Sequence, residues 1–150
     1  MVLYVMIGPS GSGKSTLAKT LAGPEDKIIS TDAIRFEIFG DEENQSNGAL
    51  VFKIAKERAR QSLKDGVNVI FDATNCITKY RKQLVNDIIN GINNVKVIGV
   101  VKMPSLSVCL ERNKKRKRHV PEDVINKQYN NLKYNLPEEG EFDEVLWYNN

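Results

Sequence analysis

The sequence predicts an α/β fold in which a parallel five-stranded sheet carries helices on both faces. Two observations lead to this prediction. Apolar runs alternate with amphipathic stretches along the chain of 150 residues, which is the pattern of repeated strand–helix–strand units. The first apolar run also leads into a glycine-rich loop that opens a helical pattern, which is the usual setting of a phosphate-binding loop in such sheets.

The glycine-rich loop, residues 8–16, matches the pattern G-x-x-x-x-G-K-[ST] of a P-loop. Its glycines allow successive backbone N–H groups to point into one concavity, and the helix that follows adds its N-terminal dipole. Lys14 is expected to reach the β- and γ-phosphates of ATP, and Ser15 to place its hydroxyl on Mg²⁺. The predicted ATP-binding residues of this loop are Gly8, Ser10, Gly11, Ser12, Gly13, Lys14, Ser15 and Thr16.

Hydrophobic periodicity predicts the other elements in chain order. Strands are expected at 2–7, 27–30, 67–71, 95–101 and 145–148, with Trp147 packed in the core. The first helix runs from the P-loop to Gly23, and the second begins near residue 31 with Ile34, Ile38 and Phe39 inward. Further helices are expected at about 47–65 with Val51, Ala55, Ala59 and Leu63 inward, between Asn75 and Gly91, from 105, and from 121.

Length and composition narrow the class of protein. A chain of this length is expected to form one domain spanning 1–150. No apolar run approaches the ~20 residues of a membrane span, so no membrane partner is expected. The two cysteines, Cys76 and Cys109, are too few for a disulfide framework or a metal cluster, which favours a reducing, cytoplasmic location. Cys109 is expected to be a small core residue.

Two charged residues follow the second expected strand. All strands of a parallel sheet end on the side where ligands bind, so Asp32 is expected to face the γ-phosphate region of the P-loop. An unpaired carboxylate there is a suitable general base for an acceptor hydroxyl. Arg35 lies on the same helix face and is predicted to hold an anionic part of the acceptor. The alternatives are that Asp32 only caps the helix and that Arg35 is a solvated surface charge.

Further polar residues follow the third expected strand. Asp72 ends that strand at the position of a Walker B carboxylate, from which it can bind the metal through water or orient other groups. Asn75 and Arg81 come next, in the loop and helix on the same ligand side. All three are predicted to contact the acceptor substrate. Alternatively, Asp72 only starts a turn and Asn75 only caps the helix.

The positive charge of the chain is concentrated in one segment. Residues 112–118 contain six Lys and Arg, and subtracting them from the net charge of +3 leaves −3 for the remainder. Arg112 and Arg116 are four residues apart and are expected to share one face of a basic helical lid over about 105–120. Arginines in such a lid stabilise the charge of a transferring phosphate and contact ATP. A solvated patch or a nuclear-localisation-like segment is the alternative.

Together these residues resemble the 5′-hydroxyl polynucleotide kinases of bacteriophages and of bacterial RNA-repair systems. The matching stretches are 8–16, 31–35, 72–75 with Arg81, and 112–116 followed by 120–121. They occur in family order and at similar spacing over nearly the whole chain. The pattern R-N-x-x-R…V-P after D-A-T-N is the most discriminating part of the resemblance, because the P-loop by itself is shared by many enzyme classes.

The resemblance implies a P-loop NTPase kinase-like fold and transfer of the ATP γ-phosphate to a 5′-OH end of RNA or DNA. It implies that Asp32 is the general base, that Arg35 contacts the acceptor's phosphate, that Lys14 and Arg116 stabilise the transferred phosphoryl group, and that Ser15 binds Mg²⁺. Nucleic acid 5′-OH ends are therefore the expected partner. No phosphatase signature D-x-D-x-T is present, and the sequence assigns no role to the acidic loop 41–45.

Two other functions stay open on the sequence alone. One is a P-loop kinase of a small hydroxylated metabolite or nucleoside, which needs no basic residues beyond a γ-phosphate clamp. The other is a nucleotide-dependent nucleic-acid-binding module, which leaves Asp32 and Arg35 without a role.

Overall fold

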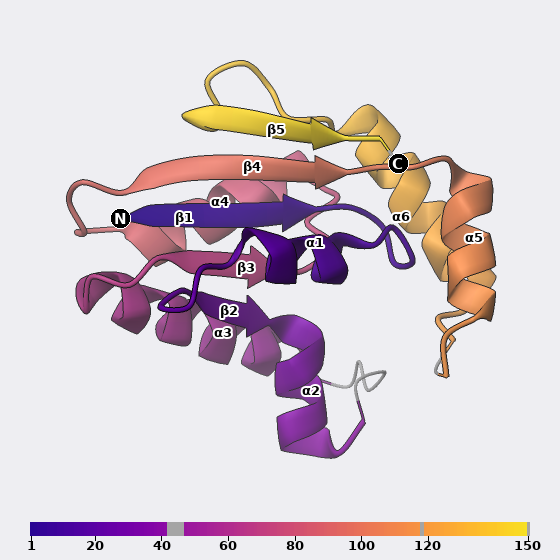
Figure 1. The fold of residues 1–150 in the computed structure, drawn as a ribbon, viewed down its shortest axis with the longest axis horizontal. Helices are drawn as coiled ribbons and strands as arrows, with labels where there is room; N and C mark the ends of the chain where they lie inside the picture. Colours follow the sequence, from indigo (N-terminus) through magenta and orange to yellow (C-terminus); the bar gives the residue numbers. More distant parts are fainter. Residues whose placement is uncertain (42–46, 118, 150) are drawn as a thin grey trace.

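The computed structural model describes residues 1–41, 47–117 and 119–149. Its strands form one parallel sheet in the order β2-β3-β1-β4-β5 (Figure 1). These strands are β1 (Val2–Ile7), β2 (Lys27–Ser30), β3 (Val69–Asp72), β4 (Lys96–Lys102) and β5 (Glu144–Tyr148). The described helices are α1 (Lys14–Leu21), α2 (Thr31–Phe39), α3 (Gly48–Lys64), α4 (Thr78–Ile89), α5 (Leu106–Lys114) and α6 (Glu122–Tyr134). The predicted α/β class with a five-stranded parallel sheet is confirmed.

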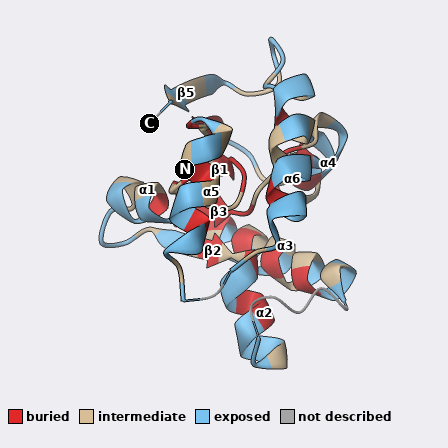
Figure 2. Ribbon diagram, turned by 90° about the vertical axis from the view of Figure 1, so that its right-hand side faces the viewer, coloured by how far each residue is buried: buried red, intermediate tan, exposed pale blue. Residues whose placement is uncertain are grey.

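The sheet is packed between helices because its strand residues alternate between two faces. Leu3, Val5 and Ile7 of β1 pack with buried residues of α3, α4 and α6, whereas Met6 packs with Ala18 of α1. Figure 2 shows α1 on one side of the sheet and α3, α4 and α6 on the other. The helix α5 lies beyond the carboxyl ends of the strands, over the P-loop (Figure 1). No described helix has the length and apolarity to cross a membrane.

The longest described helix follows the predicted pattern closely. Its inward residues Val51, Ala55, Ala59 and Leu63, spaced by four, are all fully buried. The predicted helix at 47–65 is confirmed as α3, which is capped by the side chain of Asn47 accepting a hydrogen bond from the Leu50 amide at 3.1 Å.

Three details of the predicted elements are wrong. The third strand begins at Val69 and not at 67, because the side chain of Asn68 accepts a hydrogen bond from the Val2 amide and its carbonyl accepts one from the Lys27 amide. Trp147 is 51% exposed, since it lies on the edge strand β5. Ile38 of α2, predicted to point inward, is 37% exposed. Residues 42–45 of the acidic loop 41–45 lie outside the described residues.

Candidate functional site

The P-loop, residues 8–16, bends between the end of β1 and the start of α1. Gly11 and Gly13 have φ angles of +80° and +92°, which residues with a side chain rarely adopt. No hydrogen-bond acceptor for the amides of Gly11 and Gly13 is present among the described residues. The amides of the first turn of α1 likewise have no partner within the helix. These donors form the anion site that the motif predicts.

Two glycines of the loop also lie against backbone atoms of other elements. A Cβ on Gly8 would lie 2.4 Å from the Lys102 carbonyl oxygen, and one on Gly11 would lie 2.4 Å from that of Cys109. Lys102 is the last residue of β4. Cys109 is a fully buried residue of α5, which confirms the prediction that Cys109 is a core residue. The P-loop is therefore packed against β4 and α5, and only glycine fits at these two positions.

Substitution Gly11→Ala is expected to weaken ATP binding at least tenfold and to destabilise the fold by about 1–3 kcal/mol, because the new Cβ overlaps the Cys109 carbonyl. Isothermal titration calorimetry and urea unfolding measure the two effects. Gly91→Ala is the matched control, since Gly91 has a φ of +77° but open space around a Cβ. Equal ATP affinity in the two variants would contradict the interpretation that the P-loop is packed against α5.

The remaining loop residues take different positions. Lys14 is nearly buried and lines a cleft at the carboxyl edge of the sheet, as does Ser10. The Ser10 amide donates to the Gln128 side-chain oxygen on α6 at 2.8 Å. Ser12 is fully buried and its amide donates to the Pro9 carbonyl, so neither its side chain nor this amide points to a phosphate. Thr16 is exposed in the first turn of α1.

The side chains of Ser15 and Asp72 are in contact where the P-loop leads into α1. The Ser15 hydroxyl donates to Asp72 Oδ2 at 2.7 Å, and Asp72 is the last residue of β3, as predicted. No group of three or more His, Cys, Asp or Glu that would hold a metal ion occurs among the described residues. One hydroxyl and one carboxylate fit Mg²⁺, which keeps several waters and takes its other ligands from substrate phosphates.

A cleft of about 490 Å³ opens beside this pair. Lys14 and Asp72 line this cleft together with Asp32 and Arg35 from the start of α2. The parallel pairing places Ser30 of β2 opposite Asp72 of β3, so the residues that follow both strands meet at one edge. Four residues with predicted roles therefore line one cavity. They are Asp32 (the predicted general base), Arg35 (acceptor binding), Lys14 (the P-loop lysine) and Asp72 (the Walker B carboxylate).

Asp32 and Arg35 form an ion pair. The prediction that the Asp32 carboxylate is unpaired is therefore wrong. Arg35 Nη1 donates to Asp32 Oδ1 at 2.8 Å, while the Asp32 side chain stays half exposed. Arg35 is nearly buried, and its Nε has no hydrogen-bond partner among the described residues. Asp32 does not cap α2, because the Ser30 hydroxyl accepts the bond from the Ala33 amide. Arg35 is likewise not a solvated surface charge.

Arg81 does not line the cleft, and its predicted role in binding the acceptor is wrong. Its side chain is fully buried and its Nε donates to Glu141 Oε1 at 2.7 Å, in the loop before β5. Arg81 also donates to the Asn75 carbonyl at 3.0 Å. The Asn75 side chain in turn donates through Nδ2 to the Met6 carbonyl at 2.8 Å, so it does not cap α4. These bonds hold the loop between β3 and α4 against β1.

The lid segment 105–120 differs from the expectation at its end. The helix α5 ends at Lys114, so Arg116 lies beyond it and shares no helix face with Arg112. The chain turns at the end of α5, where the Arg116 amide donates to the Asn113 carbonyl, and the Asn113 side chain bonds both the backbone amide and the carbonyl of Val120, at 3.0 and 2.7 Å. Arg112 Nη1 donates to the Ser12 carbonyl at 2.8 Å, which joins the lid to the P-loop. Arg116 is half-buried outside the cleft, and Arg118 lies outside the described residues.

Three residues that line the cleft were missed by the sequence argument. Phe52 reaches it from α3, and Val124 and Gln128 reach it from α6. The only sequence signal was their position on amphipathic helices, which does not distinguish a cleft wall from any other helix surface.

This geometry defines the class of protein. The chain has a P-loop kinase fold, with a nucleotide-phosphate site and an adjacent acceptor cleft. In the comparison with known proteins, residues 3–137 match the model of the family described as an AAA domain. The chain belongs to this family and has the fold of the small P-loop kinases.

A protein of Autographa californica nuclear polyhedrosis virus named as a bifunctional polynucleotide kinase/RNA ligase is 31% identical over an alignment of 161 residues. The alignment covers 90% of this chain and 22% of the relative. A chain of the Pnkp1/Rnl/Hen1 RNA repair complex superimposes with a TM-score of 0.77 at 25% identity, over 95% of this chain and 46% of that one. A gluconokinase from Sinorhizobium meliloti 1021 shares the fold, with a TM-score of 0.62 at 19% identity over 96% of this chain and 79% of that one. The chain thus spans less than half of the first two proteins.

Proposed function

We propose that this chain is a polynucleotide 5′-hydroxyl kinase that transfers the γ-phosphate of ATP to the 5′-OH end of RNA or DNA. The observation that carries the proposal is the cleft in which Asp32 and Arg35 face Lys14 and Asp72. A nucleotide switch or binding module needs a phosphate site but has no use for a carboxylate and a nearly buried arginine beside it.

The proposed chemistry uses the two ends of the Asp32–Arg35 pair differently. Asp32 Oδ1 is held by Arg35, and its Oδ2, which has no hydrogen bond among the described residues, accepts the proton of the attacking hydroxyl. The acceptor oxygen then bonds the γ-phosphorus while the bond from that phosphorus to the β–γ bridging oxygen breaks. Lys14 stabilises the transferring group. Ser15 and Asp72 would hold Mg²⁺, which when bound would supply positive charge beside the β- and γ-phosphates.

Arg35 is the proposed contact for a phosphate of the acceptor. Its Nε is buried and without a partner among the described residues, an arrangement that an acceptor oxygen relieves. An acceptor phosphate favours a polynucleotide over a simple sugar. The basic segment supports the same choice, because Arg112 contacts the P-loop at the Ser12 carbonyl and the neighbouring Lys114, Lys115 and Lys117 are exposed. The polynucleotide kinase named among the relatives and the RNA repair complex add weight to this proposal.

Incubation with γ-labelled ATP, Mg²⁺ and a short 5′-OH oligonucleotide is expected to label the oligonucleotide. The RNA and DNA versions are compared, with a gluconate and a nucleoside as alternative acceptors. The KM for the oligonucleotide is expected to rise with salt, because the basic segment neutralises backbone phosphates. If a small acceptor is labelled and no oligonucleotide is, the chain is a kinase of a small metabolite. If ATP binds and no phosphoryl group is transferred, a nucleotide-dependent binding module is favoured.

A further inference from the structure

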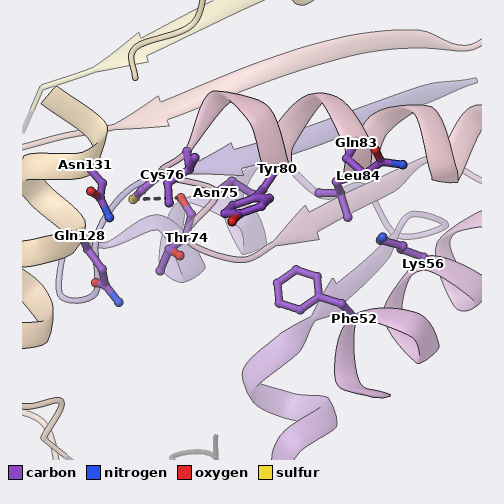
Figure 3. A pocket seen from close by; sticks show the side chains of 11 residues that line it. Phe52, Lys56, Thr74, Asn75, Cys76, Tyr80, Gln83, Leu84, Gln128 and Asn131 are labelled. Atoms are coloured by element: carbon purple, nitrogen blue, oxygen red, sulfur yellow. Dashed lines mark hydrogen bonds between the residues drawn. The ribbon is translucent and has the colours of Figure 1, made fainter. Parts of the chain in front are cut away.

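We propose that a second cavity behind the cleft receives the nucleobase of the acceptor's 5′-terminal nucleoside. The cavity has a volume of about 370 Å³ and lies between α3, α4 and α6 (Figure 3). It shares Phe52, Thr74 and Gln128 with the cleft that holds Asp32. A nucleoside whose 5′-OH is at Asp32 can therefore place its base there. This inference rests on the proposed function, because it assigns a part of the same acceptor.

The walls of the cavity fit a flat and largely apolar ring. Figure 3 shows Phe52 on the α3 side and both Tyr80 and Leu84 on the α4 side. Burial raises the pKa of the Cys76 thiol to about 11, so this lining group stays uncharged near neutral pH. Aromatic side chains hold bases of any sequence by stacking, since every base has a π-face. A polyhydroxylated sugar has no such face.

The polar groups of the cavity lie at its edges. Gln128 and Asn131 reach it from α6, where their amides suit the hydrogen-bonding edge of a base (Figure 3). Lys56 and Gln83 line the opposite edge, but both donate to Asp87, at 2.7 and 2.9 Å. The Lys56 charge is thus already neutralised by Asp87, so the cavity is not built for an anion. A neutral ring with polar edges is the ligand that fits both observations.

Tyr80 and Phe52 differ in how they are held. Phe52 packs against the buried Phe71, with ring centroids 6.4 Å apart, so its position is set by the core. Tyr80 is 65% exposed, although it lines a largely apolar cavity. An exposed aromatic ring contributes little to folding stability. In this cavity the ring is available to stack on a nucleobase. Tyr80 is therefore the residue whose removal tests the cavity without damaging the protein.

Tyr80→Ala is expected to raise the KM for a 5′-OH oligonucleotide about 5- to 150-fold, the range of a lost base–aromatic stack, and to leave the KM for ATP unchanged. Tyr80→Phe keeps the ring and should remain near the wild type. Tyr134→Ala is the matched control, because Tyr134 is 82% exposed on α6 and does not line the cavity. An oligonucleotide that is abasic at its first position should bind wild type and Tyr80→Ala equally.

A binding measurement separates this inference from the proposed function. An oligonucleotide with 2-aminopurine as its first base is expected to lose fluorescence on binding the wild type, through stacking, and much less on binding Tyr80→Ala. Labelling of oligonucleotides with unchanged KM and equal quenching in both proteins would overturn the base cavity and leave the kinase intact. Tyr80-dependent quenching without any phosphoryl transfer would support the cavity and overturn the kinase.

Discussion

Substitution Asp32→Asn is expected to reduce the kcat of phosphoryl transfer by about 10²- to 10⁴-fold, the usual contribution of a general base. The amide has nearly the same shape, and its oxygen still accepts a hydrogen bond from Arg35, whose Nη1 lies 2.8 Å from Asp32 Oδ1. It does not accept the proton of the attacking hydroxyl. ATP affinity should stay within about twofold, since the phosphates are held by the P-loop. Single-turnover transfer and calorimetric titration with ATP measure the two quantities.

Glu37→Gln provides the control for this substitution. Glu37 is an exposed residue of the same helix α2, pairs with Arg58 at 2.8 Å and does not line the cleft. Its neutralisation should leave kcat unchanged. Retention of more than a third of the wild-type kcat in Asp32→Asn would remove Asp32 from the role of base and leave it as the partner that orients Arg35.

The largest effect on stability is expected for Glu141→Ala, at about 3–5 kcal/mol in the free energy of unfolding. Both nitrogens of the Arg81 guanidinium that face Glu141 donate to its carboxylate, at 2.7 and 3.1 Å, and both side chains are buried. Truncation leaves the buried arginine charge without its partner. Urea unfolding followed by circular dichroism measures the loss.

Glu138→Ala is the matched control, because Glu138 pairs with Lys82 at 2.7 Å in the same loop but in an exposed position. Exposed ion pairs contribute little to stability, so this variant should unfold near the wild-type urea concentration. Replacing the pair together, as Arg81→Met with Glu141→Leu, should recover most of the loss. If Glu141→Ala unfolds like Glu138→Ala, the buried pair is not what anchors the loop after β3.

The Arg81–Glu141 pair also explains how a structural bond supports the candidate site. Arg81 donates to the backbone carbonyl of Asn75, and Nδ2 of the Asn75 side chain donates to the carbonyl of Met6 near the end of β1. The segment held in this way carries Thr74, which lines both cavities and accepts the amide hydrogen bond of Gly8. A partly folded Glu141 variant is therefore expected to lose catalytic rate along with stability.

The sequence by itself determined the features that depend on neighbours in the chain. The P-loop, the alternation of strands and helices, and the inward face of α3 are local patterns, so residues 8–16 and Val51 through Leu63 were placed correctly. The general rule that parallel strands end at one edge was enough to bring Asp32, Ser15 and Asp72 together.

Tertiary structure alone decided which polar groups find a partner. Arg81 meets Glu141 across 60 residues, and Ser10 meets Gln128 across 118, distances at which no periodicity carries a signal. The turn closed by Asn113 ended α5 before Arg116, and the edge position of β5 left Trp147 exposed. In each case the outcome depends on the surroundings of a side chain in the folded chain, because burial and hydrogen bonding are set by distant elements and not by the residue's own segment.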